Sequence, residues 1–315
     1  MNSARRCGLV RSLWSVVSQG RRSSSFVRDA YINIQQQSSN IPKEQALYSE
    51  LHVREWLQGF QGGKVHVEKC LDTGVVSVIL DYPERRNALS GNMMVQLSDV
   101  IRDLELWADG RVLLLRGAGR QFCSGGDLSF MRQIADPLSG SKMCIFMQGV
   151  TGRLHRLPLI SFAVVEGHAL GGGAELASAC DFRLFDSNAK IGFVQARLGV
   201  NTGWGGGTHL TRQIGPRKAL RLLTTGQTLD AQAALEFGVA DDMFEAKDEE
   251  EMKKKVQAFV DPILDCSADA VKAFKRIVIH ADQCPYTEAM NRERDIFAQS
   301  WGSPDHLKAL QKLSK

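Results

Sequence analysis

Three consecutive glycines, Gly171, Gly172 and Gly173, constrain the fold of this chain more than any other feature. They follow an apolar stretch at residues 159–165 that predicts a strand, and they precede a segment at residues 174–179 that predicts a helix. Glycine lets the backbone approach a ligand closely, and the N–H groups of a first helical turn are unpaired and carry a partial positive charge. The order strand, glycine turn and helix therefore predicts a site for an oxyanion.

A carboxylic acid, Glu175, lies in the first turn of the same predicted helix. A proton-handling group and an anion-stabilising backbone are thus expected within a few residues of each other. From these residues alone, an alternative stays open. The glycines could permit only tight packing of the strand against the helix, and Glu175 could only complement the helix dipole.

The composition excludes several classes of protein. The chain has 315 residues, of which 43% are hydrophobic and 23% are charged, as is ordinary for a globular protein. Its formal net charge of +4 is mild and gives no sign of nucleic-acid binding. No apolar run approaches the length of a membrane span. The seven cysteines form no CxxC pair and have no Cys/His ligand spacing, so we expect reduced thiols in an intracellular protein and no metal site.

The N-terminal segment has a composition of its own. Residues 1–29 are rich in arginine and serine, and the first acidic residue is Asp29. This is typical of a mitochondrial transit peptide, although a disordered basic tail without a targeting role has the same composition. We therefore divide the chain into a disordered N-terminal segment at 1–41, for which a targeting peptide is one of these two explanations, a core at 42–247 and a helical region at 248–315.

From residue 64 onward the pattern predicts a repeating unit of strand, strand and helix. Residues 64–82 predict a hairpin around Asp72, Thr73 and Gly74, and Ser90 is expected to cap a helix at 91–108. The further expected elements are a helix at 44–60, a strand at 111–117, a glycine turn opening a helix after residue 126, a helix at 143–156, and helices at 208–214, 217–224, 230–237, 249–265, 268–280 and 286–299.

The segment VEGHALGGGAELASACDFRL, followed without a gap by KIGFVQARLG and later by GWGGG, resembles the central motif of the crotonase superfamily, also called the enoyl-CoA hydratase/isomerase family. The resemblance implies an α/β crotonase (ClpP-like) fold, in which ββα units form a right-handed superhelix followed by a C-terminal helical region. In the family that region makes trimer contacts and closes part of the acyl-CoA pocket. The implied partners are a short-chain carboxyacyl-CoA substrate and further copies of the chain, as a homotrimer or a dimer of trimers, with no nucleic acid and no membrane.

The same resemblance assigns two backbone donors to the thioester oxygen. They are Gly126, in the motif SGGDL, and Gly172, in the middle of the glycine triplet. A thioester becomes an enolate when its α-carbon loses a proton or a carboxylate, and negative charge then moves onto that oxygen. Preorganised N–H groups contribute on the order of 3–4 kcal/mol per donor at such a position.

The resemblance also implies residues that bind the substrate. The segment PERRNALS resembles the family element that holds CoA through its phosphates and pantetheine, and the SGGDL turn would border the adenine. The tryptophan in GWGGG is expected to shape the acyl pocket. The implied binding residues are Arg85, Arg86, Ala88, Ser124, Asp127, Leu128 and Trp204.

One position departs from the hydratase pattern. Hydratases of the family hold a water molecule between two glutamates, and the second of these positions is occupied here by Gln195. An amide cannot act as a general base, and neither neighbour, Ala196 or Arg197, can replace one. We therefore do not expect hydration, unless another residue supplies the base.

Decarboxylation of a malonyl-type thioester needs no base, because the departing carbon dioxide leaves its electron pair on the α-carbon. Burial and the nearby substrate carboxylate should raise the pKa of Glu175, so that this residue protonates the enolate. Gln195 would hold the departing carboxylate by a hydrogen bond. On this interpretation the catalytic residues are Gly126, Gly172, Glu175 and Gln195, and no cofactor is needed, since CoA belongs to the substrate.

Four segments, RLPLISFAVVEGHALGGGAELASACDFRL, NTGWGGGTHL, CIFMQ and NRERDIFAQSWGSP, resemble a subgroup of the family that decarboxylates short branched malonyl-CoA thioesters as a metabolite-repair step. Two alternatives stay open. One is an enoyl-CoA isomerase that uses a single glutamate, and the other is a catalytically silent binding protein with the crotonase fold. The repair substrates favour the cytosol, whereas the N-terminal composition favours the mitochondrial matrix.

Overall fold

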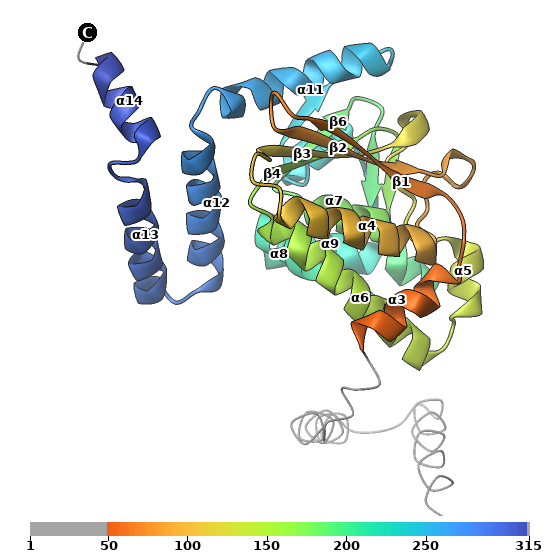
Figure 1. Cartoon of the computed structure of the whole chain (residues 1–315). Helices are drawn as coiled ribbons and strands as arrows, with labels where there is room; N and C mark the ends of the chain where they lie inside the picture. Colours follow the sequence, from red (N-terminus) through yellow and green to blue (C-terminus); the bar gives the residue numbers. More distant parts are fainter. Residues whose placement is uncertain (1–48, 314–315) are drawn as a thin grey trace, which may run out of the picture. The chain divides into compact units, whose positions relative to one another are not determined.

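Two β-sheets support the rest of the chain (Figure 1). In the larger sheet β1 is antiparallel to β2 and all other neighbours are parallel. Its strands, in spatial order, are β1 (Lys64–Cys70), β2 (Val75–Asp81), β3 (Val112–Gly117), β4 (Ile160–Val165), β6 (Phe182–Asp186) and β9 (Asp242–Phe244). The smaller sheet contains β5 (His168–Leu170), β7 (Lys190–Gly192) and β8 (Thr228–Asp230).

The computed structural model describes residues 49–313. The N-terminal segment at 1–41, for which a targeting role is one of two predictions, lies outside the described residues. Within residues 49–313 no helix combines the length and the apolar character needed to cross a membrane.

Helices connect the strands and cover the larger sheet. They are α3 (Glu50–Gln58), α4 (Gly91–Glu105), α5 (Leu128–Gln133), α6 (Pro137–Arg156), α7 (Gly172–Ser178), α8 (Gly206–Ile214), α9 (Pro216–Thr225), α10 (Ala231–Phe237), α11 (Glu249–Leu264), α12 (Ala268–Gln283), α13 (Tyr286–Ser300) and α14 (Pro304–Leu313). Short 3₁₀ turns lie at Pro83–Arg85, Ala118–Arg120 and Val194–Leu198.

Most of the elements predicted from the pattern are confirmed, with small shifts of their ends. The predicted hairpin is present, with Cys70 paired to Val75 across a turn in which Gly74 has φ +72°. Ser90 caps α4 by accepting from the Met93 N–H. Helix α6 begins at Pro137 rather than at the predicted residue 143, because the Asp136 side chain accepts two N–H groups of its first turn.

The chain passes twice through the two sheets in the same order, from the larger sheet to the smaller one and then into a helical segment. After β4 in the larger sheet it forms β5 in the smaller one and then α7, and after β6 it forms β7 and then the 3₁₀ turn Val194–Leu198. This is the expected strand, strand and helix unit. Parallel strands joined in this way are almost always connected with a right-handed crossover, which makes the succession a spiral.

Each face of the larger sheet has a hydrophobic core. Helices α4 and α7 lie on one face and α11 lies on the other (Figure 1). The main core contains fully buried side chains of the sheet and of α4 and α6, such as Leu80, Met94 and Leu154. A smaller core on the other face joins Phe162 and Leu184 to Val256 of α11 and its neighbours.

Helix α12 is fastened to the larger sheet by a buried ion pair. The Nζ of Lys275 donates to the carbonyl of Leu159 and to Oδ2 of Asp181, each at 2.6 Å, and the lysine side chain is only 4% exposed. The same Asp181 oxygen also accepts from the N–H and hydroxyl groups of Ser161. Helix α13 packs against α12, so this ion pair positions the C-terminal helices.

Replacing this lysine by methionine should destabilise the fold. The substitution Lys275→Met leaves the partly buried Asp181 charge without its cation and the Leu159 carbonyl without its donor, and we expect a loss of about 3 kcal/mol in the free energy of unfolding. Chemical denaturation measures the loss. The control Lys253→Met removes an exposed lysine that pairs with Glu249 one helical turn away, and it should cost less than about 0.5 kcal/mol. Equal losses in the two variants would contradict the role given to Lys275.

Candidate active site

Two glycine turns lie side by side because the strands that lead into them are in parallel register. Cys123 forms a parallel bridge with Ala169: its N–H donates to the carbonyl of His168 at 2.9 Å, and its carbonyl accepts from the N–H of Leu170 at 3.0 Å. Gly126 and Gly172 each follow the bridged residue by three positions. Neighbouring strands are roughly 4.8 Å apart, so the register brings the two predicted donors to one place.

The two predicted donors are free to bind a ligand. Among the described residues, neither the Gly126 N–H nor the Gly172 N–H donates to another protein group. The turns are in contact, since a Cβ built on Gly125 would lie 3.1 Å from the Gly172 nitrogen. Two adjacent unpaired N–H groups, one of them at the N-terminus of α7, are what an enolate oxygen requires.

The packing role of the glycines is present together with the free N–H groups. A Cβ on Gly173 would lie 2.1 Å from the carbonyl oxygen of Cys123, and a Cβ on Gly172 would lie 2.4 Å from the ring of Trp204. Glycine is therefore required at both positions for the close approach of α7 to its neighbours. The glycines therefore permit tight packing, as one prediction required, and the N–H groups of Gly126 and Gly172 are also left unpaired, as the prediction of an anion site required.

Glu175 is buried in α7 and its carboxyl group is surrounded by N–H donors. Oε1 accepts from Nε2 of Gln195 at 2.8 Å and from the N–H of Gly203 at 3.3 Å. Oε2 accepts from the N–H of Trp204 at 2.7 Å and from the N–H of Gly206 at 2.9 Å. The structure thus brings the predicted Glu175 and Gln195 into direct contact, although they are 20 residues apart in sequence.

Burial raises the pKa of Glu175, and the four N–H donors oppose this rise without reversing it. The direction agrees with the prediction from sequence, and burial is its largest cause. A carboxyl group with a raised pKa holds its proton at a higher pH than an exposed glutamate does. Glu175 is therefore suited to give a proton to a carbon atom beside it.

The three backbone donors to Glu175, which we call the Glu175 cradle, belong to Gly203, Trp204 and Gly206. Side chains of α6 hold this cradle: the Thr151 hydroxyl donates to the Trp204 carbonyl at 2.7 Å, and the Cys144 thiol donates to the Gly203 carbonyl at 2.9 Å. The sequence predicted a helix at 143–156, and its segment 144–148 was matched to the family subgroup. The support that this helix gives to the Glu175 cradle was not predicted. The available signal was a buried helical face, since Met147 and Thr151 follow each other at a spacing of four.

Trp204 packs its ring over Gly172 and is 3% exposed. Its indole N–H donates to the Met143 sulfur at 2.9 Å, and its backbone carries one donor of the Glu175 cradle. The ring therefore lies directly beside one predicted oxyanion donor, and the backbone touches the predicted acid. This placement agrees with the expectation that Trp204 shapes the acyl pocket, which stays a prediction.

The loop expected to hold CoA is fixed by Asn87, whose role was not predicted from the sequence. Its side chain is fully buried, with Oδ1 accepting from the Tyr82 N–H and Nδ2 donating to the carbonyls of Ala118 and Gln121. Asn87 and Arg86 also have left-handed backbones, with φ of 54° and 52°. The asparagine in the quoted segment PERRNALS was a signal for this, because asparagine tolerates that conformation and bonds to backbone groups.

The expected CoA-binding residues meet at the SGGDL turn. The Ser124 N–H donates to the Arg86 carbonyl at 3.0 Å, and its hydroxyl donates to the Arg85 carbonyl at 3.1 Å. Both arginine side chains are exposed, as is Leu128, whereas Ala88 is buried. Asp127 is also buried, where its carboxylate caps α5. Asp127 therefore has a structural role in addition to the predicted one.

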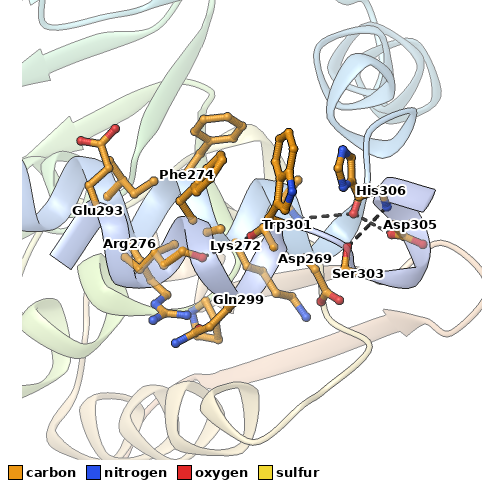
Figure 2. Close-up of a pocket in the computed structure, with 18 of the residues that line it drawn as sticks. Asp269, Lys272, Phe274, Arg276, Glu293, Gln299, Trp301, Ser303, Asp305 and His306 are labelled. Carbon is orange, nitrogen blue, oxygen red and sulfur yellow. Dashed lines mark hydrogen bonds between the residues drawn. The ribbon is translucent and has the colours of Figure 1, made fainter. Parts of the chain in front are cut away.

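A separate groove lies among α12, α13 and α14 (Figure 2). Its volume is about 750 Å³, and its lining combines apolar rings, among them Phe274, Phe297 and Trp301, with charged side chains such as Lys272 and Glu293. Figure 2 shows the rings of Phe274 and Trp301 on the same side of the helices. None of the site residues described above lines this groove.

Comparisons with known proteins agree with this geometry. The Enoyl-CoA hydratase/isomerase family matches residues 71–312 of the chain. A zebrafish (Danio rerio) protein named ethylmalonyl-CoA decarboxylase is 40% identical over 269 residues, which cover 85% of this chain and 89% of that protein. A human protein of the same name is 38% identical over 276 residues, which cover 86% of this chain and 90% of that protein.

A solved structure confirms the predicted crotonase fold. The crystal structure of an enoyl-CoA hydratase from Bacillus anthracis superimposes with a TM-score of 0.75 at 26% sequence identity, and the match covers 80% of this chain and 96% of that one. The family match extends from the β1–β2 turn to α14, so it includes both glycine turns, Glu175 and Gln195. This chain belongs to the enoyl-CoA hydratase/isomerase family.

Proposed function

We propose that this protein is an ethylmalonyl-CoA decarboxylase, which converts ethylmalonyl-CoA to butyryl-CoA and, less efficiently, methylmalonyl-CoA to propionyl-CoA. The observation that carries the proposal is a single buried carboxyl group, Glu175, beside two free N–H groups, with an amide, Gln195, where hydratases place a second glutamate. Relatives with that name, 38–40% identical over at least 85% of the chain, support it.

The reaction begins when the thioester oxygen is bound by the N–H groups of Gly126 and Gly172. The bond between the α-carbon and the carboxylate breaks, carbon dioxide leaves, and the electron pair moves through the α-carbon onto the thioester oxygen as an enolate. The two N–H groups stabilise this charge. The acid form of Glu175 then protonates the α-carbon, which gives the saturated acyl-CoA and leaves Glu175 ionised. The sequence of steps needs no cofactor.

Gln195 favours this reaction over hydration. Its Nε2 carries two N–H groups, of which one donates to Glu175 at 2.8 Å. The second remains for the substrate carboxylate, which it would orient without adding a charge that holds the carboxylate in place. No general base stands at this position to activate water. In this scheme Arg85 and Arg86, exposed beside the SGGDL turn, bind the CoA phosphates.

Turnover of ethylmalonyl-CoA and crotonyl-CoA, measured side by side with the purified protein, tests the proposal. We expect butyryl-CoA from the first and no 3-hydroxybutyryl-CoA from the second. A single glutamate also fits an enoyl-CoA isomerase, so a 3-enoyl-CoA belongs in the same assay. Hydration or isomerisation without decarboxylation would overturn the proposal.

The substitution Glu175→Gln should slow turnover by about 10²-fold or more while leaving CoA-ester binding within about threefold, because it removes the proton donor but keeps the shape. Since the reaction requires the acid form, the wild-type rate should fall as the pH rises through the raised pKa of Glu175. Steady-state kinetics over a pH series and calorimetric binding of butyryl-CoA measure these effects. Unchanged turnover would remove Glu175 from the mechanism.

The substitution Gln195→Glu should suppress decarboxylation by at least about tenfold. It places a second carboxyl group within 3 Å of Glu175, so the two groups would share a proton and repel the substrate carboxylate. The same variant recreates the glutamate pair of the hydratases. A gain of crotonyl-CoA hydration in this variant would support the interpretation of position 195. Full decarboxylase activity would contradict the role given to Gln195.

We extend the proposal to assembly, as a homotrimer or a dimer of trimers. Exposed apolar side chains follow one another along α12 and α13, where Phe274 and Trp301 are both 66% exposed and Phe297 is 55% exposed. Apolar surface of this kind favours contact with another protein chain. The groove of Figure 2 lies on the same helices, and we assign it to contact with a second copy.

Light scattering should give about three or six times the mass of one chain. The substitution Trp301→Glu puts a charge into the apolar surface and should shift the protein toward monomer. The control Leu106→Glu changes a leucine that is 86% exposed at the end of α4, and should leave the mass unchanged. A monomeric wild type would refute the assembly proposal.

Ethylmalonyl-CoA is a side product of acetyl-CoA carboxylation, which takes place in the cytosol. We therefore propose a metabolite-repair role there for this protein. The basic N-terminal segment leaves the mitochondrial matrix as the alternative location.

A further inference from the structure

The two polar atoms of the Gln195 amide have unequal surroundings. Nε2 donates to Glu175, whereas Oε1 is buried and has no hydrogen-bond partner among residues 49–313. The whole residue is only 8% exposed. Burying an acceptor without a donor costs its hydration free energy, so this orientation is unfavourable for the oxygen of the amide. A half-turn of the amide exchanges nitrogen and oxygen without changing the shape of the side chain.

The carboxyl group of Glu175 explains why the unfavourable orientation is kept. Each of its oxygens accepts from two N–H donors and from no other group, which suits the ionised form. When Glu175 is protonated, its O–H needs an acceptor. The Glu175 cradle cannot supply one, because its three groups are backbone N–H donors. Among the four donors, only the amide of Gln195 can turn and present an oxygen.

We propose that Gln195 is a positioning residue whose amide turns with the proton on Glu175. When Glu175 is ionised, Nε2 of Gln195 faces it, in the orientation that this structure has. When Glu175 is protonated, Oε1 of Gln195 accepts the O–H, and Nε2 turns toward the substrate carboxylate. This inference rests on the proposed decarboxylation for its place in catalysis, but the turn itself requires only Glu175 and Gln195.

The rotation of the Gln195 amide gives Glu175 and the substrate carboxylate a suitable hydrogen-bond partner at each step of the reaction. Before the reaction, the protonated Glu175 donates to Oε1 of Gln195, and the free Nε2 holds the substrate carboxylate. Carbon dioxide leaves, the enolate forms, and the Glu175 proton passes to the α-carbon. The amide then turns back and Nε2 donates to the new carboxylate. Glu175 regains a proton from water, so one proton is consumed for each carbon dioxide released.

A second glutamine of this chain provides a matched control. Gln213 in α8 also donates from Nε2, to the carbonyl of Ser178 at 2.7 Å, and its Oε1 is likewise buried without a hydrogen-bond partner among the described residues. A backbone carbonyl does not titrate. The amide of Gln213 therefore has no reason to turn with pH.

Titratable groups on neighbouring elements do not interfere with this pH dependence. Cys144 of α6 has its thiol pKa raised by burial and by the charge of Glu175, so it stays neutral. His209 of α8 packs beside Gly205, and burial lowers its pKa to about 4. His155 stacks on His209 and has its pKa lowered by burial as well. A carboxyl titration that is absent from Glu175→Gln is thus that of Glu175, whose pKa is raised by burial.

Neutron diffraction from crystals of the full-length deuterated protein without substrate tests the proposal directly, since neutrons distinguish nitrogen from oxygen and locate deuterons. The midpoint for Glu175 is first found from its ¹³C carboxyl shift, and crystals are equilibrated on either side of it. On the alkaline side we expect Nε2 of Gln195 to face an ionised Glu175, and on the acid side we expect Oε1 to face a deuterated one. Gln213 should keep one orientation throughout.

Two results would overturn the proposal: Nε2 facing Glu175 on both sides of the midpoint, or a Glu175 whose pKa is not raised above that of an exposed glutamate. The crystals contain no substrate, so this test does not depend on the proposed reaction. If the amide turned but the protein failed to decarboxylate ethylmalonyl-CoA, only the proposed function would be refuted.

Kinetics provide a second readout. Gln195→Met, which has no donor and only a weak sulfur acceptor, should lower kcat by at least about tenfold with KM within about threefold, whereas Gln213→Met should stay within about twofold of wild type. Equal kcat values for Gln195→Met and wild type would also overturn the proposal.

Discussion

The parallel bridge between Cys123 and Ala169 is the constraint on which the active site depends. Backbone hydrogen bonds fix the register of the two segments, and both glycine turns begin the same number of residues beyond it. A shift of either segment by one residue would separate the two N–H groups and reverse the faces of the side chains that follow. The pair of unpaired N–H groups is therefore built from backbone alone, and the absence of a Cβ on Gly172 and Gly173 permits the close packing around it.

The same sheet arrangement leads to the second requirement, a buried carboxyl group at the start of α7. Burial of a carboxylate is costly, and here four N–H donors reduce that cost. Three of these donors come from the Glu175 cradle, which is held in turn by Thr151 and Cys144 of α6. Glu175 is thus positioned by a backbone loop and a helix that are far from it in sequence, and its proposed role as proton donor depends on this position.

The sequence predicted what depends on local pattern. Alternating and β-branched residues predicted β1, β2 and β3, and Ser90 predicted the start of α4. The glycine motifs and the family resemblance pointed to Gly126, Gly172 and Glu175, whose catalytic roles stay predictions. Contacts between distant segments could not be predicted in this way. Three such contacts each join segments at least 31 residues apart: Asn87 fixes the loop expected to hold CoA, α6 supports the Glu175 cradle, and Lys275 pairs with Asp181. Short strands such as β5 and β7 escaped because three residues carry too little periodicity.

The contact between Gln195 and Glu175 explains how one fold supports different reactions. A glutamate at position 195 would share its site with a like charge and could activate water, as in the hydratases of the family. Glutamine has nearly the size of glutamate, and its amide donates a hydrogen bond to Glu175. The site then has one titrating carboxyl group instead of a coupled pair of carboxyl groups. The oxyanion donors are backbone groups and do not change with this substitution. In the proposed mechanism, the choice between hydration and decarboxylation is therefore set by the number of titratable groups beside the two backbone donors.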